Sequence, residues 1–243
     1  MARGARRRAL AALQAVRREL TVQAPHNCAA LRRRPAGTMR DRVVVFDIES
    51  TGLDVETERI VSLSACITRD DGSKETFDRL VNPGVLIPAS ASRVNKIYDE
   101  TVSGVDSFDV VGVAFLRWVH KHAGDSPILC AFNGTKFDFQ MLYYELRRHC
   151  KPDDVPDFAT LESVDPYVMA RALIPSTEMR NYKQTSVYEH LPGGQTVFAE
   201  QPSGVHSSMG DTDALDRIIT HELFADELPQ HLRRLKSLKK FLQ

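Results

Sequence analysis

The sequence predicts an α/β fold in which a mixed sheet, with three antiparallel strands followed by parallel strands, is flanked by helices. Two observations lead to this prediction. Apolar residues in the first part follow the two-residue period of strands, and later ones follow the spacing of amphipathic helices that alternate with short apolar runs. A chain of 243 residues, 42% of them hydrophobic and 26% charged, suits one sizeable globular domain with extensions.

Three successive segments have the pattern of strands. Residues 43–49 form a β-branched run, residues 59–69 alternate between apolar and polar side chains, and residues 77–81 end at the turn sequence NPG. Strands that follow one another closely in the sequence usually lie next to each other in the sheet. We therefore expect an antiparallel meander here.

Helices and short strands alternate in the following part of the chain. Residues 107–122 and 137–150 carry apolar side chains at helical spacing, and residues 127–132 between them are typical of a buried strand. The other expected elements are a strand over residues 158–164, a helix that ends at Leu173, a short helix over residues 185–191 and a helix over residues 211–223. The sequence contains no G-x-G-x-x-G or G-x-x-x-x-G-K-[ST] pattern, which argues against dinucleotide and P-loop chemistry.

The net charge of zero conceals two basic ends. Residues 1–42 contain eleven arginines against two acids, and residues 228–243 contain five Lys or Arg and no acid, so the body between them is acidic. Such a body is poorly suited to gripping a long duplex by phosphate neutralisation. We expect a basic N-terminal extension over residues 1–42, a main domain over residues 43–224 and a basic C-terminal helix over residues 225–243.

The N-terminal extension has the composition of a targeting segment. An arginine-rich, acid-poor amphipathic helix resembles a mitochondrial transit peptide, although residues 1–42 contain no serine. Alternatively, residues 32–34 form a nuclear-import cluster, or the extension is a solvated basic arm. A nuclear or cytoplasmic location is therefore the alternative. The chain has no secretory h-region and no run of roughly 18 apolar residues, so we expect neither secretion nor a membrane span.

Five residues in three separated stretches carry the functional signal. Asp47 and Glu49 lie in VVVFDIESTGLD, Asp138 lies in AFNGTKFDFQML, and His206 and Asp211 lie in HSSMGDTDAL. Because side chains alternate between the faces of a strand, Asp47 and Glu49 should point the same way. Crowded carboxylates repel each other unless a cation lies between them, so together these acids predict a two-metal site for phosphoryl transfer.

Each stretch alone also has an ordinary explanation. D-x-E pairs are common on solvated faces, an acid in the first turn of a helix favours the helix dipole, and a lone histidine is often structural. The joint occurrence of the three stretches is what favours the metal site.

The patterns D-x-E-[ST]-T-G-L, N-G-x-x-F-D and H-x-x-x-x-D-x-x-A occur in this order over residues 43–224. They resemble the three motifs of the DEDDh group of DnaQ-like 3′-to-5′ exonucleases, and NGTKFDFQML is closer to the three-prime repair exonuclease branch than to the polymerase proofreading subunit. The resemblance implies a ribonuclease H-like fold, an exonuclease domain over residues 43–224, and release of mononucleotides from 3′ ends with two Mg²⁺ or Mn²⁺ ions.

The resemblance also implies a role for each residue of the motifs. Asp47, Glu49 and Asp211 would hold the first metal ion, and Asp47 together with Asp138 would hold the second. His206 would accept the proton of the attacking water, a task that suits its ordinary pKa of about 6.5.

A second set of residues is expected at the terminal nucleotide. Thr51 and Leu53 would contact it, with Gly52 allowing close approach of the backbone, and Phe137 would stack there. Asn133 is a further candidate for substrate binding. The alternatives are that Phe137 belongs to the helix core and that Asn133 caps the helix.

The expected partner is the 3′ end of a single-stranded nucleic acid, with DNA favoured and RNA left open, because nothing in the motifs reads a 2′-hydroxyl. The alternatives are an RNA-trimming exoribonuclease of the same family and a non-catalytic module that binds nucleic-acid ends. A third alternative is a glycosidase built on two carboxylates. Such an enzyme needs no metal, so activity in EDTA would favour it.

Overall fold

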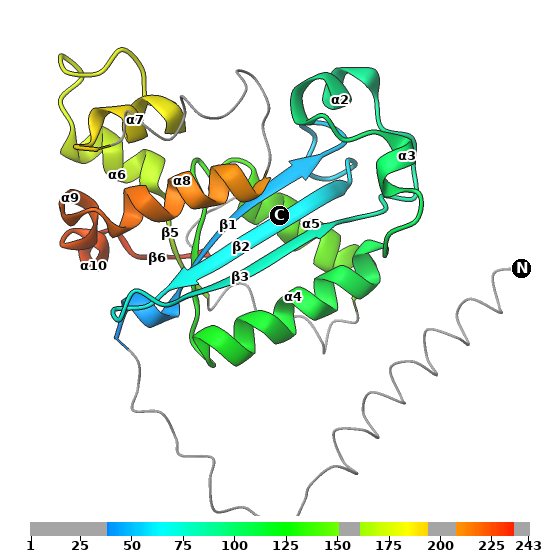
Figure 1. The fold of residues 1–243 in the computed structure, drawn as a ribbon, viewed down its shortest axis with the longest axis horizontal. Helices are drawn as coiled ribbons and strands as arrows, with labels where there is room; N and C mark the ends of the chain where they lie inside the picture. Colours follow the sequence, from blue (N-terminus) through cyan, green and yellow to red (C-terminus); the bar gives the residue numbers. More distant parts are fainter. Residues whose placement is uncertain (1–37, 151–160, 194–207, 236–243) are drawn as a thin grey trace, which may run out of the picture. The chain divides into compact units, whose positions relative to one another are not determined.

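The computed structural model describes residues 38–150, 161–193 and 208–235, and their strands form one six-stranded sheet with the order β3-β2-β1-β4-β5-β6 (Figure 1). The strands are β1 (Val43–Ser50), β2 (Ile60–Thr68), β3 (Lys74–Leu80), β4 (Ile128–Cys130), β5 (Glu162–Val164) and β6 (Arg233–Arg234).

The first three strands form an antiparallel meander, and β4 and β5 add to the other edge of β1 as parallel strands. The predicted mixed sheet is thereby confirmed. β3 begins at Lys74, three residues before the predicted start, because its first residues are polar and exposed yet still pair with β2. An edge strand needs no continuous apolar face, so its polar start was not recognised.

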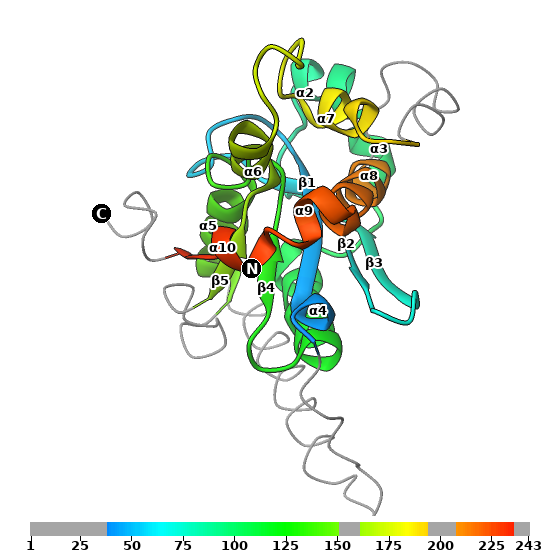
Figure 2. The same ribbon diagram turned by 90° about the vertical axis from the view of Figure 1, so that its left-hand side faces the viewer.

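Helices cover both faces of the sheet (Figures 1 and 2). α4 (Phe108–Ala123) and α5 (Asp138–His149) pack on one face, in the core that contains Phe46. The other face is covered by residues of α6 (Pro166–Leu173), α7 (Gln184–His190), α8 (Ser208–Thr220), α9 (Glu222–Ala225) and α10 (Leu228–His231).

Two short helices that the sequence did not predict, α2 (Ala89–Asn95) and α3 (Asp99–Val102), lie between β3 and α4 in the chain. Val102 packs there with Val61 of β2 in a third, smaller core. Helices of one or two turns are too short for a helical period to emerge from the sequence. A 3₁₀ turn, η1 (Arg40–Arg42), precedes β1.

The alternation of β1 places the candidate acids. Phe46 and Ile48 point into the core below α4 and α5, whereas Val43 and Val45 point into the core below α8. Asp47 continues the second face and is half-buried, like Glu49 two residues later. The sequence prediction that Asp47 and Glu49 lie on the face of the strand opposite to Phe46 and Ile48 is confirmed.

The chain after α8 differs from the prediction of a single basic helix over residues 225–243. The described part contains α9 and α10, and then β6 pairs antiparallel with β5. The backbone N–H of Leu235 donates to the carbonyl of Leu161 at 3.0 Å, and the Leu235 side chain is buried in the main core. Pairing with the open edge of β5 gives hydrogen-bond partners to the backbone of residues 233–235, and this overrides the helical spacing of Leu232 and Leu235.

Several predicted features lie outside the described residues. These are the first 37 residues of the basic extension, the start of the expected strand over residues 158–164, His206, and residues 236–243. In the described part of the chain, none of the helices has the length and apolar character that crossing a bilayer requires.

Candidate active site

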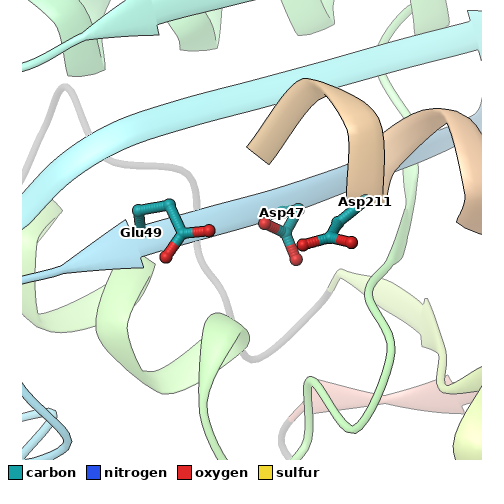
Figure 3. A group of neighbouring side chains, drawn as sticks. All are labelled: Asp47, Glu49 and Asp211. Atoms are coloured by element: carbon teal, nitrogen blue, oxygen red, sulfur yellow. The ribbon is translucent and has the colours of Figure 1, made fainter. Parts of the chain in front are cut away.

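Three acids from two distant segments meet above β1. Asp47 and Glu49 project from the same face of the strand, and Asp211 projects from the first turn of α8 (Figure 3). One carboxylate oxygen from each of the three lies within 4.8 Å of the others. This separation is short enough for all three to share a cation.

The start of α8 is fixed opposite these acids by three serine hydroxyls. The hydroxyl of Ser208 lies 2.6 Å from those of both Ser62 and Ser64 on β2. In the β1–β2 register, Ser62 pairs with Glu49 and Ser64 pairs with Asp47. The buried serines therefore fix the position of the start of α8 along β1 and β2. Sequence reasoning missed them, although polar residues at alternate positions of the apolar run IVSLSACIT were a signal.

Further polar contacts hold α8 along the sheet. Asp216 accepts hydrogen bonds from Thr68 at 2.8 Å and from Lys74 at 3.0 Å. At the other end of the helix, the side-chain amide of Gln184 on α7 donates to the backbone carbonyl of Asp211 at 2.6 Å. Because Asp216 is buried, its charge needs these partners, and together they restrict sliding of the helix that carries Asp211.

Asp138 adds a fourth carboxylate from the start of α5. Its side chain is 6% exposed, and the nearby backbone N–H of Ile48, which lies between Asp47 and Glu49 in the chain, acts to lower its pKa. Burial raises the pKa of Asp138 to about 7, with nearby Asp165 and Glu49 contributing, while backbone N–H groups oppose the shift. The pKa of Asp47 is also raised, first by burial and then by the negative charges of Asp138, Asp211 and Glu49.

The raised pKa values of Asp47 and Asp138 mean that bare, ionised carboxylates are unfavourable at this site. A divalent cation would remove both the repulsion and the cost of burial. A set of carboxylate oxygens suits hard cations such as Mg²⁺ and Mn²⁺, and offers none of the sulfur or imidazole ligands of a structural zinc site among the described residues. The residues present therefore fit a divalent metal ion.

The stability of the metal-free protein should consequently fall as pH rises. The folded protein keeps the Asp138 proton up to about pH 7, whereas the unfolded chain releases it near 3.8. Since the folded state then binds more protons, the contribution of Asp138 to the free energy of unfolding decreases between these pH values. Calorimetry in EDTA should show this decrease, and Mg²⁺ should raise Tm more at pH 7.5 than at pH 5.5.

Asp138→Asn provides the control for this prediction, since asparagine keeps the shape and cannot titrate. The variant should lose part of the decrease in Tm between acid and neutral pH. An identical pH dependence of Tm in both proteins would contradict the raised pKa of Asp138.

A buried acid that sequence reasoning missed shapes the loop before Asp138. Oδ1 of Asp165, at the end of β5, accepts the backbone N–H of Asn133 at 2.8 Å and that of Tyr167 at 3.1 Å, and Oδ2 accepts that of Thr135 at 3.2 Å. The loop needs this support because Asn133 has a positive φ of 57°. Asp165 thus joins the start of α6 to the segment that leads into Asp138. Its position at the end of a short strand, just before Pro166, was a signal for a helix cap.

Asp165→Asn should weaken metal binding without changing any proposed ligand. One carboxylate oxygen becomes an amide N–H that faces a backbone N–H of the loop, which should cost about 1–3 kcal/mol in the free energy of unfolding. The shifted loop should raise the Mg²⁺ concentration needed for half-maximal activity, and excess Mg²⁺ should restore part of the rate. Asp71→Asn is the matched control, because Asp71 accepts the backbone N–H of Ser73 in the exposed β2–β3 turn, away from the metal site. Unchanged Mg²⁺ dependence in Asp165→Asn would show that Asp165 does not position Asp138.

Two of the residues that are predicted to contact a nucleotide, Thr51 and Gly52, have close contacts within the turn after β1. Thr51 is 2% exposed, and its hydroxyl donates to the carboxylate of Glu58 and accepts the backbone N–H of Arg59 at 2.9 Å. A Cβ at Gly52 would lie 2.7 Å from the side chain of Glu58, so close packing within the turn explains this glycine. The hydroxyl of Thr51 therefore has partners inside the protein, and contact of Thr51 and Gly52 with a nucleotide stays a prediction.

The other three candidates for substrate binding differ in exposure. Leu53 follows the same turn with its side chain 88% exposed, so it is available to a ligand. Phe137 is partly buried against the main core, in agreement with the alternative of a core residue, and directly precedes Asp138. Asn133 lies outside α5, whose N-cap is Phe137, so it does not cap that helix. Their roles at a nucleotide stay predictions.

The segment that carries these carboxylates matches a known protein family. Residues 44–218 match the model of the family described as Exonuclease (RNase_T), and this stretch contains Asp47, Glu49, Asp138 and Asp211. The chain belongs to this exonuclease family. It therefore carries a nuclease domain, and the predicted relationship to DnaQ-like exonucleases is confirmed. The narrower likeness to the three-prime repair branch stays a prediction.

Curated relatives of this exonuclease domain come from plants and bacteria. Exonuclease DPD1, chloroplastic/mitochondrial, of Arabidopsis thaliana is 31% identical over 180 residues, which cover 72% of this chain and 54% of that protein. The DNA polymerase III subunit epsilon of Treponema pallidum is 30% identical over 154 residues, which cover 63% of this chain and 66% of the subunit. The match spans between about half and two thirds of these relatives' lengths.

Solved structures support the fold of the exonuclease domain. E. coli exonuclease I in complex with a dA13 oligonucleotide superposes with a TM-score of 0.58, at 15% identity, over 81% of this chain and 44% of that one. At this identity the likeness concerns the fold. It confirms the predicted ribonuclease H-like mixed sheet flanked by helices.

Proposed function

We propose that this protein is a metal-dependent 3′-to-5′ exonuclease that releases mononucleotides from the ends of DNA. The observation that carries the proposal is the meeting of Asp47, Glu49 and Asp211 within 4.8 Å, with the buried Asp138 beside them. A protein that bound nucleic-acid ends without cleaving them would not need to keep four mutually repelling carboxylates in one place.

The proposed roles follow the positions of the acids. Asp47, Glu49 and Asp211 would hold one divalent ion, and Asp47 with Asp138 would hold a second. When bound, two such ions stabilise the attacking and the leaving oxygens of an in-line displacement at phosphorus. His206, five residues before Asp211 in the chain, would accept the proton of the attacking water.

The names of relatives support the polarity and the nucleic acid. A protein of Bacillus subtilis that is 27% identical over 153 residues is named 3′-5′ exonuclease DinG, although this chain covers only 15% of its length. The epsilon relatives are subunits of a DNA polymerase, and the superposed exonuclease I holds a DNA oligonucleotide. These names favour DNA as the substrate and the 3′ end as the point of attack.

Degradation of end-labelled oligonucleotides tests this function directly. Single-stranded and duplex DNA and RNA, labelled at the 5′ or the 3′ end, would be incubated with Mg²⁺, Mn²⁺ or EDTA. We expect 5′-labelled DNA to give a ladder of shortening products with either metal and no products in EDTA. Faster cleavage of RNA would assign the exoribonuclease alternative, shortening from the 5′ end would overturn the polarity, and activity in EDTA would overturn the metal dependence.

We also propose a mitochondrial location. The arginine-rich, acid-poor segment at the start of the chain supports it, as does the name of the Arabidopsis relative, which places that protein in chloroplasts and mitochondria. Organelle fractionation with mass spectrometry of the mature N-terminus tests this. An intact first segment in a nuclear or cytoplasmic fraction would overturn it.

A further inference from the structure

Two cations and two tyrosine rings alternate on the surface next to the carboxylate cluster. The guanidinium carbon of Arg171 lies 5.9 Å from the ring centre of Tyr167 and 5.4 Å from that of Tyr182. Nζ of Lys136 lies 5.8 Å from the ring centre of Tyr167. Lys136, Tyr167, Arg171 and Tyr182 are called the basic–aromatic surface below.

The basic–aromatic surface adjoins the site through the loop that Asp165 supports. Lys136 is two residues before Asp138, so their Cα atoms are at most about 7 Å apart. The backbone N–H of Tyr167 shares the same oxygen of Asp165 with the N–H of Asn133. The part of this surface formed by Lys136 and Tyr167 is therefore close to the segment that carries Asp138, within reach of a strand whose terminal nucleotide is at the acids.

The cations of this surface are not used to neutralise acids of the fold. Within the described residues, neither Lys136 nor Arg171 forms an ion pair with a carboxylate, whereas Lys74 and Arg42 do. Both Lys136 and Arg171 are exposed. An uncompensated positive surface in an acidic body, next to a nuclease site, is complementary to a polyanion.

The tyrosines prepare Arg171 for such a ligand. The hydroxyl of Tyr182 donates to the carbonyl of Ile174 at 2.7 Å, and Arg171 donates to the hydroxyl of Tyr167 at 3.3 Å. The rings thereby hold the guanidinium in position while leaving it exposed. A guanidinium fixed in this way loses less side-chain entropy when it binds a phosphate.

We propose that the basic–aromatic surface binds the backbone phosphates of a single-stranded nucleic acid on the 5′ side of its terminal nucleotide. The inference rests on the proposed exonuclease function and extends it to the path of the strand. Binding to phosphates carries no sequence information, so the surface should raise affinity for long strands of any sequence.

The test compares a long substrate with one that has no strand beyond the terminal nucleotide. The double variant Lys136→Gln/Arg171→Gln would be assayed on a single-stranded DNA oligonucleotide and on the 4-nitrophenyl ester of thymidine 5′-monophosphate. We expect KM for the oligonucleotide to rise about tenfold, with the slope of log(kcat/KM) against log[salt] reduced by about 0.7 for each phosphate that the variant no longer neutralises. Hydrolysis of the small ester should keep the wild-type rate.

Arg117→Gln is the matched control, since Arg117 is an exposed arginine of α4, on the face of the sheet opposite to α6. It should leave both substrates unaffected. An unchanged KM and salt slope for the oligonucleotide in the double variant would overturn the inference, as would equal losses on oligonucleotide and ester. If the wild type hydrolyses neither substrate, the proposed function fails. Fluorescence anisotropy of the labelled oligonucleotide in EDTA then still decides whether the double variant binds the strand more weakly than the wild type.

Discussion

Asp47→Asn should abolish the release of mononucleotides, with a loss of at least about a thousandfold in kcat/KM. Asp47 lies at the centre of the cluster, where burial and the charges of Asp138, Asp211 and Glu49 all raise its pKa. The amide keeps the shape of the side chain but removes the charge that both proposed metal positions share. The same change should raise Tm of the metal-free protein, because a buried, repelled charge disappears. Oligonucleotide degradation, Mn²⁺ titration calorimetry and thermal unfolding in EDTA measure these effects.

The combination of lower activity and higher stability separates a metal ligand from a residue needed for folding. Asp70→Asn is the control, because Asp70 is an exposed acid just beyond β2, near η1 and away from the cluster. It should change neither activity nor Tm. If the activity of Asp47→Asn stays within tenfold of that of the wild type, the proposed site is wrong. A Tm in EDTA below that of the wild type would show that the charge of Asp47 stabilises the fold.

The sequence predicted those parts of the fold that are long or strongly periodic. β1, β2, α4 and α5 occur within a few residues of their predicted bounds, because each buries one face and shows it as a period. β6 was not predicted. Its formation depends on the open edge of β5, which lies about 70 residues earlier in the chain, and no local pattern contains that information.

In the candidate site, too, the sequence predicted what depends on local pattern and not the contacts between distant segments. Asp47 and Glu49 were predicted to share a face from strand alternation alone, and the structure brings Asp211 to them. The serine hydrogen bonds that fix α8 on the sheet join residues far apart in the chain, so they could not be derived from spacing. Thr51 was expected at a nucleotide because it lies in a motif. Its hydroxyl also bonds Glu58 within the turn, a role that the sequence does not reveal.

His206→Ala should lower kcat about 10²- to 10⁴-fold while leaving the affinity for Mn²⁺ close to that of the wild type. The reason is that His206 is proposed to accept a proton, a task in turnover, and is not among the proposed ligands. In the wild type, log(kcat/KM) should fall at acid pH as the imidazole becomes protonated, and this acid limb should be absent from the variant. Rates of oligonucleotide degradation across pH, with Mn²⁺ titration calorimetry at each pH, measure both quantities.

Acid titration of the carboxylates complicates the pH profile, because protonation of Asp138 near pH 7 also weakens metal binding. The two causes separate at saturating Mn²⁺, where the carboxylates are held ionised and the remaining acid limb belongs to the base. His120→Ala is the matched control, since His120 is 73% exposed on α4. A parallel loss of Mn²⁺ affinity in His206→Ala would make His206 a structural or metal-binding residue. His206→Ala should lose turnover and keep metal binding, whereas Asp47→Asn should lose turnover because a shared metal ligand is removed. This contrast would separate proton transfer from metal binding in this site.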